Sequence, residues 1–170
     1  MLIAAALWVV CYWLNRCLLG FVALSETASW VFLPAAVRLL MVLLWRWQGA
    51  LGLFLGTLLT NQTLVDLQWQ QSLGVAAISS LAPWFAVLIG QRRYAIGSSL
   101  AGLTAAQLCA FAALSALISG GLHASCFAAI GISPELGSTV VAMAIGDFLG
   151  AMVVLYLLRF ALRWPARGAR

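Results

Sequence analysis

Long apolar runs separated by short polar breaks make up most of the chain. A helix needs about 20 mainly apolar residues to cross a bilayer, and most of the runs approach or exceed that length. We therefore predict an all-α, polytopic membrane bundle of about six helices, in a single domain that covers residues 1–170 without a soluble domain. The polar breaks place the predicted spans at residues 2–24, 30–45, 49–66, 72–90, 95–118 and 138–160.

Composition agrees with this hydrophobic pattern. Hydrophobic residues make up 65% of the chain, charged residues only 8%, and the mean hydropathy is +1.07. A soluble domain of this size has too little interior to bury so much apolar surface. The chain is therefore expected to be an integral membrane protein surrounded by membrane lipid. Despite the net charge of +5, we expect no nucleic-acid binding, because the basic residues follow the membrane topology.

The distribution of charge along the chain predicts the orientation of the helices. Arginine supplies every basic charge, whereas Glu26, Asp66 and Glu135 lie at or after the ends of the first, third and fifth predicted spans. Cytoplasmic connections are enriched in arginine and lysine, so both termini are predicted to be cytoplasmic. The first run resembles a signal sequence but lacks a basic start, and we interpret it as a retained span. The arginines that lie at the ends of even-numbered spans, directly after them or in the tail are Arg46, Arg92, Arg93, Arg159, Arg163, Arg167 and Arg170.

The third predicted span is short. As a helix, Gly49–Asn61 covers only about 20 Å of a hydrocarbon core about 30 Å thick. This span must therefore either continue through Thr63–Leu67 or enter the membrane only partway. Gly52 and Gly56 within it form a pair of small residues four positions apart, a spacing that lets helix backbones approach closely. We interpret the pair as a packing feature, with a substrate path as the alternative.

Three ionisable residues lie inside apolar spans. Arg16, Arg38 and Asp147 each fall about 12–15 Å below the predicted outer membrane boundary. An unpaired charge is costly there, so Asp147 is expected to pair with one arginine and leave the other uncompensated. We hypothesise an outward-facing polar pocket in which the spare guanidinium binds a small anion: a carboxylate, a phosphate or a lipid head group. Asn15 and Gln107 are candidates to line the same cavity.

Structural explanations exist for the same residues. The two arginines could extend toward the outer head groups, and an Arg–Asp bridge could simply hold helices together. Asn15 and Gln107 could hydrogen-bond across helix interfaces. His123 falls in a predicted outer loop at residues 119–137, and we interpret it as a solvated residue rather than a metal ligand. We recognise no catalytic motif and expect neither a metal nor another cofactor.

Two stretches of the sequence resemble a known family. Residues 30–37 (WVFLPAAV), followed by residues 49–56 (GALGLFLG) and Asn61, and residues 146–150 (GDFLG) near the end, resemble the motifs of bacterial membrane-associated sensor domains of the MASE type. The matching positions are Trp30, Pro34, Asn61, Gly146, Asp147 and Gly150. The resemblance implies a sensory module of the bacterial inner membrane, of a kind usually fused to a histidine kinase or a cyclic-dinucleotide enzyme.

The chain departs from that family pattern because it has no recognisable output domain and fewer helices than usual. A sensor of this form would act through a separate membrane partner or as a homo-oligomer. Two alternatives stay open. The helix count and the pocket also resemble the substrate-binding subunit of an energy-coupling-factor vitamin transporter. The chain could also be an assembly or stabilising subunit of a larger membrane complex.

Overall fold

The structure, a computed structural model, describes residues 1–20, 29–65, 67–94, 103–131 and 136–163. Within these described residues the all-α prediction is confirmed, and five helices are long and apolar enough to cross a membrane. Glu26, Asp66, Glu135, Arg167 and Arg170, together with residues 21–24 and 95–102 of the predicted spans, lie outside the described residues. The elements are α1 (Leu2–Leu19), α2 (Pro34–Thr60), the π-helical turn η2 (Asn61–Val65), α3 (Trp69–Tyr94), α4 (Ala105–Ala129) and α5 (Leu136–Arg163).

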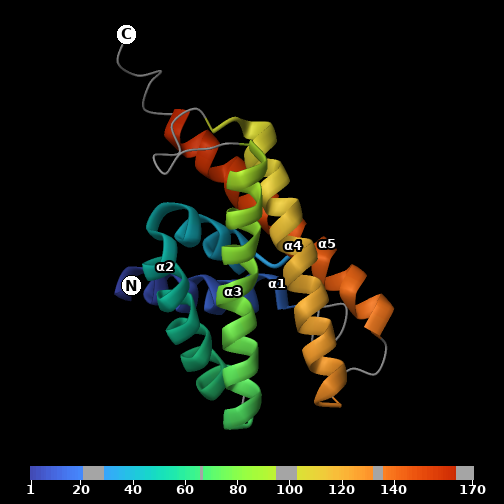
Figure 1. The fold of residues 1–170 in the computed structure, drawn as a ribbon. Coiled ribbons are helices and arrows are strands. Elements are labelled where there is room, and N and C mark those ends of the chain that lie inside the picture. The colour runs from blue at the N-terminus through green and yellow to red at the C-terminus, as the bar shows by residue number, and fades with distance from the viewer. Residues whose placement is uncertain (21–28, 66, 95–102, 132–135, 164–170) are drawn as a thin grey trace.

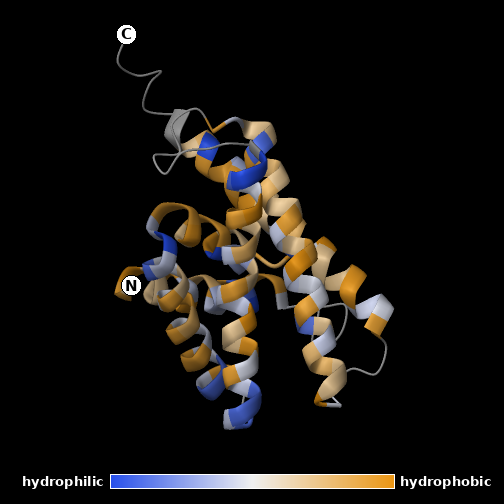
Figure 2. Ribbon diagram, in the orientation of Figure 1, coloured by the Kyte–Doolittle hydropathy of each residue, from blue (hydrophilic) through white to orange (hydrophobic). Residues whose placement is uncertain are grey.

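Helices α3, α4 and α5 form an antiparallel series, and α2 packs against α1, α3 and α5 (Figure 1). The C-terminal ends of α3 and α5 consequently lie at the same end of the molecule, together with Arg92, Arg93 and Arg159. Figure 2 shows hydrophilic residues concentrated at the two ends of α3, with a mainly hydrophobic stretch between them. This arrangement suits helices whose middle parts face hydrocarbon and whose ends reach the polar interface.

Helix α2 is sharply bent at Arg46, which has a positive φ of 51°. The carbonyl of Met41 occupies the position that a side chain at Gly49 would take. A straight helix would separate residues eight apart by about 12 Å, so the chain folds back at the bend (Figure 1). Two of the predicted spans are therefore two limbs of one helix, a first limb at residues 34–45 and a second limb at residues 47–60. Arg46 donates from Nη1 to Oε1 of Gln91 at 2.6 Å, which ties the bend to the end of α3.

The second limb of α2 shows how long the third predicted span is. The helix continues beyond Thr60 through the π-helical turn η2 to Val65. A helix over residues 47–65 is about 28 Å long, close to the thickness of the hydrocarbon core. Of the two predicted possibilities, the structure therefore has the longer helix.

The first limb begins at Pro34 rather than at the predicted Trp30, because residues 29–33 lie across α5 in non-helical form. The carbonyl groups of Ser29 and Phe32 fill the spaces that side chains at Gly146 and Gly150 would need. Non-helical backbone at membrane depth requires hydrogen-bond partners inside the protein. The amide of Phe32 donates to the Gly146 carbonyl at 2.9 Å. The Leu33 amide donates to Oδ1 of Asn15, also at 2.9 Å.

The packing interpretation of the glycine pair in the second limb is confirmed. A side chain at Gly52 would meet Ala4 and the Met1 carbonyl, and one at Gly56 would meet Trp8 and the Ala5 carbonyl. The contacts advance together along both chains, so α1 runs parallel to the second limb. Removing the side chains from this interface lets the two backbones approach closely, as small residues do in other membrane helices.

The predicted loop at residues 119–137 is wrong over its first half, because α4 continues to Ala129. The pair Gly120-Gly121 suggested a break, since glycine disfavours helices in water. In the structure, Gly120 faces α5, where an added Cβ would lie 3.0 Å from the Val140 carbonyl oxygen and from the Ala144 nitrogen. This close contact gives the glycine a packing role inside a helix, which a local reading of the sequence does not reveal.

The glycine contacts lead to a first prediction. Replacing Gly150 with Ala should destabilise the protein by about 1–3 kcal/mol, because the new methyl group meets the Phe32 backbone, which cannot move freely. Gly121→Ala is the matched control, since nothing lies within 4 Å of an added Cβ there. It should leave stability unchanged or raise it by about 0.5–1 kcal/mol. Unfolding in detergent would measure both effects, and equal effects of the two variants would contradict this account of the packing.

Candidate functional site

A cavity of about 770 Å³ lies between all five helices. Small-molecule sites in proteins typically have volumes of about 300–1,000 Å³. Most helices contribute residues spaced four positions apart, which places them on one helical face. The lining includes Trp8, Tyr12, Asn15 and Arg16 of α1, Arg38 and Thr57 of α2, Asn61 of η2, Val75 and Ser79 of α3, Ser119, His123 and Phe127 of α4, and Met143 and Asp147 of α5.

A buried ion pair joins the first limb of α2 to α5. Nη2 of Arg38 lies 2.5 Å from Oδ2 of Asp147, and the two side chains are only 4% and 9% exposed. A buried pair stays ionised only when further hydrogen bonds compensate its lost hydration. Arg38 also donates from Nη1 to Oγ of Ser119 at 2.9 Å. The predicted pairing of Asp147 with one of the two arginines is confirmed.

Aromatic rings surround the guanidinium of Arg38. Its Cζ lies 5.8 Å from the ring centroid of Trp8 and 5.4 Å from that of Phe32. These distances permit cation–π attraction, which is stronger where water is absent. The ring of Tyr12 completes a cluster, with centroids 6.0 Å from Trp8 and 6.2 Å from Phe32. We call Trp8, Tyr12 and Phe32 the aromatic wall of the cavity.

His123 extends this polar network from α4 to α3. Nδ1 lies 2.9 Å from the carbonyl oxygen of Ser119, which can only accept, so Nδ1 carries a proton. In the neutral ring Nε2 is then an acceptor, and Oγ of Ser79 donates to it at 3.2 Å. The interpretation of His123 as a solvated loop residue is wrong: it lies inside α4 and is 8% exposed.

Arg16 lies at a more exposed part of the same cavity. It donates from Nη1 to the carbonyl oxygen of Leu64 in η2. Carbonyl groups at the end of a helix lack partners within the helix, which makes them available to such a donor. Within the described parts of the chain, no carboxylate forms a salt bridge with Arg16. The cavity thus contains Arg16 and the Arg38–Asp147 pair.

The structure brings together most of the predicted site residues but not Gln107. Asn15 and Asn61 line the cavity with Arg16, Arg38 and Asp147. Gln107 instead belongs to the capping box at the start of α4, where its Oε1 accepts from the Thr104 amide at 2.8 Å. That position is about 24 Å along the helix axis from His123. The prediction of Gln107 as a cavity residue is therefore wrong. Its side-chain amide instead bonds to a backbone N–H group at the start of α4, which has no partner within the helix.

The motif positions from the two ends of the chain meet in space. Pro34 starts the first limb, and Gly146 and Gly150 accommodate the non-helical segment directly before it. Asp147 lies between these glycines and binds Arg38, one turn after Pro34. Trp30 is 44% exposed and does not line the cavity. Most of these positions thus have a structural role, because they hold the first limb of α2 and α5 together at the cavity.

Several cavity residues were not predicted from the sequence, chiefly Trp8, Tyr12, Thr57, Ser79, Ser119 and His123. Some carried a detectable signal. Trp8, Tyr12 and Arg16 are four residues apart, as are Ser119, His123 and Phe127. The second series was hidden by the interpretation of residues 119–137 as a loop.

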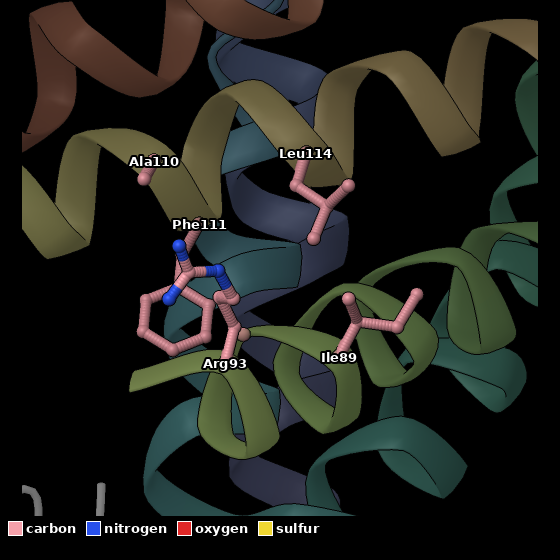
Figure 3. A pocket seen from close by; sticks show the side chains of 6 residues that line it. Ile89, Arg93, Ala110, Phe111 and Leu114 are labelled. Carbon is pink, nitrogen blue, oxygen red and sulfur yellow. The ribbon is translucent and has the colours of Figure 1, made fainter. Parts of the chain in front are cut away.

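A smaller cavity of about 210 Å³ lies between α3 and α4 (Figure 3). Among the described lining residues, Arg93 is the only ionisable one, and the ring of Phe111 fills the space beside Gly90. The remaining lining is aliphatic, so this cavity lacks the converging polar groups of the larger one. Its lining residues are Ile89, Gly90, Arg93, Ala110, Phe111 and Leu114.

Comparisons of the chain with protein-family models, with curated proteins and with solved structures find no match. The larger cavity, with its charged and polar lining, is therefore the feature of the molecule that bears on function.

The ion pair leads to a second prediction. Arg38→Gln and Asp147→Asn should each cost about 3–5 kcal/mol of stability, because each leaves the other charge buried without its partner. The double variant should lose much less than the sum, since it removes both charges. Equilibrium unfolding of the purified proteins in detergent would measure the coupling. Arg159→Gln on the exposed part of α5 should change little, and additive effects of the two cavity variants would refute the pairing.

Proposed function

We propose that the chain is a receptor within the bacterial inner membrane that binds a small organic anion and passes its occupancy to a signalling partner, in the manner of a MASE-type sensor. The observation that carries this proposal is the charge of the cavity lining. Arg16 and Arg38 line one cavity, and Asp147 is the only carboxylate among the described lining residues. The cavity thus offers an excess positive charge to a ligand.

Arginine chemistry supports a carboxylate or phosphate as the bound group. Guanidinium groups present several N–H donors in a plane that matches the oxygens of these anions. The contacts of Arg38 with Asp147 and Ser119 use only some of its donors. The surrounding aromatic wall lowers the local dielectric, which strengthens the attraction for an anion.

The proposed orientation places the cavity toward the outer side of the membrane. The first limb of α2, together with the non-helical segment 29–33, then represents one crossing and the second limb with η2 another, which restores the six predicted spans and puts both termini in the cytoplasm. The common end of Arg92, Arg93 and Arg159 in Figure 1 supports this orientation through the positive-inside rule. Arg16 lies near the end of α1, at η2, which is the opposite end of the second limb from Arg46.

Binding can reach the cytoplasmic side through α5. A ligand anion at Arg38 competes with Asp147 for the same guanidinium, and the residues next to Asp147 hold the non-helical segment 29–33. A change in the ion pair would therefore alter how α5 packs against this segment. Because α5 continues to Arg163, its far end is available to a partner in the membrane or at its surface.

A second candidate is the solute-binding subunit of a transporter. The non-helical segment 29–33 and the bend in α2 interrupt the helices close to the cavity. Interrupted helices next to a site deep in the bilayer are typical of transporters. Co-purification with an ATPase module would favour this candidate, and a change in a partner's kinase or cyclase activity in Asp147→Asn would favour the sensor. An assembly subunit would bind a partner but no solute.

The binding proposal predicts ligand-dependent stability. Acetate, succinate, phenylacetate, inorganic phosphate and glycerol 3-phosphate would be tested for their effect on thermal unfolding, with ethanolamine as a cationic control. A bound anion at 100 times its Kd should stabilise the protein by about 2.7 kcal/mol. Arg16→Gln should remove most of this effect.

Arg92→Gln is the matched control, because it removes the same charge at an exposed site outside the cavity. This variant should keep the full stabilisation. If no anion in the panel stabilises the parent protein, or if the two variants respond equally, the receptor proposal is wrong.

The orientation can be tested on intact bacterial cells. In a background without the native cysteines, Gly131→Cys at the end of α4 should react with a membrane-impermeant maleimide from outside. Arg92→Cys at the end of α3 should react only after the inner membrane is permeabilised. The opposite pattern would mean that the cavity faces the cytoplasm.

A further inference from the structure

Thr57 has a buried hydroxyl group that lacks a hydrogen-bond partner in the described part of the protein. The residue is 2% exposed and lines the cavity. Threonine and serine inside helices commonly donate to a carbonyl of the preceding turn. The Thr57 hydroxyl forms no such bond. Four other helical hydroxyls do: those of Thr60, Thr63, Ser80 and Ser125.

Thr57 belongs to the part of α2 that packs against Trp8 of the aromatic wall. The Trp8 ring covers Gly56, the neighbour of Thr57, and its Nε1 donates to Oγ1 of Thr60 at 3.2 Å. The same ring lies 5.8 Å from Cζ of Arg38. Trp8 therefore contacts both the cationic part of the cavity and the turns of α2 on either side of Thr57.

A buried hydroxyl without a partner lowers the stability of the folded protein, so its retention requires an explanation. A ligand atom that pairs with Oγ1 of Thr57 in the occupied cavity would explain it. Such a ligand would also contact flat aromatic surfaces, which favour another ring in an offset or edge-on arrangement. The cavity thus combines an anion-binding part, an aromatic wall and a separate hydrogen-bonding group.

We propose that the bound anion is a ring-bearing organic acid with a hydroxyl or carbonyl group remote from its acid group. The carboxylate binds Arg16 and the unused donors of Arg38, the ring packs on the aromatic wall, and the remote oxygen pairs with Oγ1 of Thr57. This inference rests on the proposed receptor function and names the class of its ligand. An inorganic phosphate or a lipid head group lacks the ring and would not use the aromatic wall.

Two acids that differ by one hydroxyl test the proposal on the purified full-length protein. The probes are phenylacetate and 4-hydroxyphenylacetate, with Kd measured by calorimetry in detergent. The parent protein should bind the hydroxylated acid about 5–10-fold more tightly, the range that a net hydrogen bond provides. Thr57→Val should abolish that preference. Without ligand, this variant should unfold at the same temperature as the parent or higher, because it removes the unpaired hydroxyl.

Thr63→Val is the matched control, since it removes an exposed hydroxyl that bonds to the Leu59 carbonyl of its own helix. It should keep the preference for the hydroxylated acid. If Thr57→Val fails to fold, Thr57→Ser and Thr57→Ala provide the same comparison, with the preference kept in the first and lost in the second.

The possible results separate this inference from the receptor proposal. Equal binding of the two acids by the parent protein, with Arg16→Gln still weakening both, overturns the role of Thr57 and leaves the receptor intact. Stabilisation by inorganic phosphate or by phosphatidylglycerol vesicles, but by neither acid, overturns the ring-bearing ligand and again leaves anion binding intact. Failure of every anion to bind overturns both proposals.

Discussion

The buried ion pair between Arg38 and Asp147 is the interaction on which the rest of the site depends. Neither charge is stable in hydrocarbon alone, so the first limb of α2 must lie within hydrogen-bond distance of α5. Gly146 and Gly150 make that approach possible, because their missing side chains leave room for the backbone of residues 29–33. The pair thus explains why small residues flank Asp147 in the sequence.

The same constraint explains the break before Pro34. The carbonyl groups of Ser29 and Phe32 occupy the positions that side chains at Gly146 and Gly150 would take, so the backbone of residues 29–33 itself packs against α5. The non-helical backbone is acceptable at this depth because the Gly146 carbonyl and the Asn15 side chain satisfy its amides. Asn15 therefore supports the ion pair indirectly, and α1 is held where it encloses the cavity.

The net charge of the cavity lining and the hydrogen bonding of its polar groups together define the chemical character of the cavity. Arg38, Ser119, His123 and Ser79 form a continuous network across α2, α4 and α3. Arg16 contributes a further positive charge, and Thr57 contributes a hydroxyl without a partner among the described residues. A polar network of this kind inside a membrane bundle is costly unless its members are paired. The groups left incompletely paired are therefore the ones that the proposed ligand would satisfy.

The sequence by itself determined the class of fold and the need for a charge pair, because hydropathy and the cost of a buried charge are properties of local segments and single residues. It identified Arg16, Arg38, Asn15 and Asp147 as cavity residues, and Asn61 only as a motif position. Only the tertiary structure decided which arginine binds Asp147, since that depends on distances between helices. It also decided that His123 lies inside α4, that Gln107 caps a helix, and that Thr57 faces the cavity. The physical reason is that glycines and polar side chains act through contacts with distant segments, which local sequence patterns do not contain.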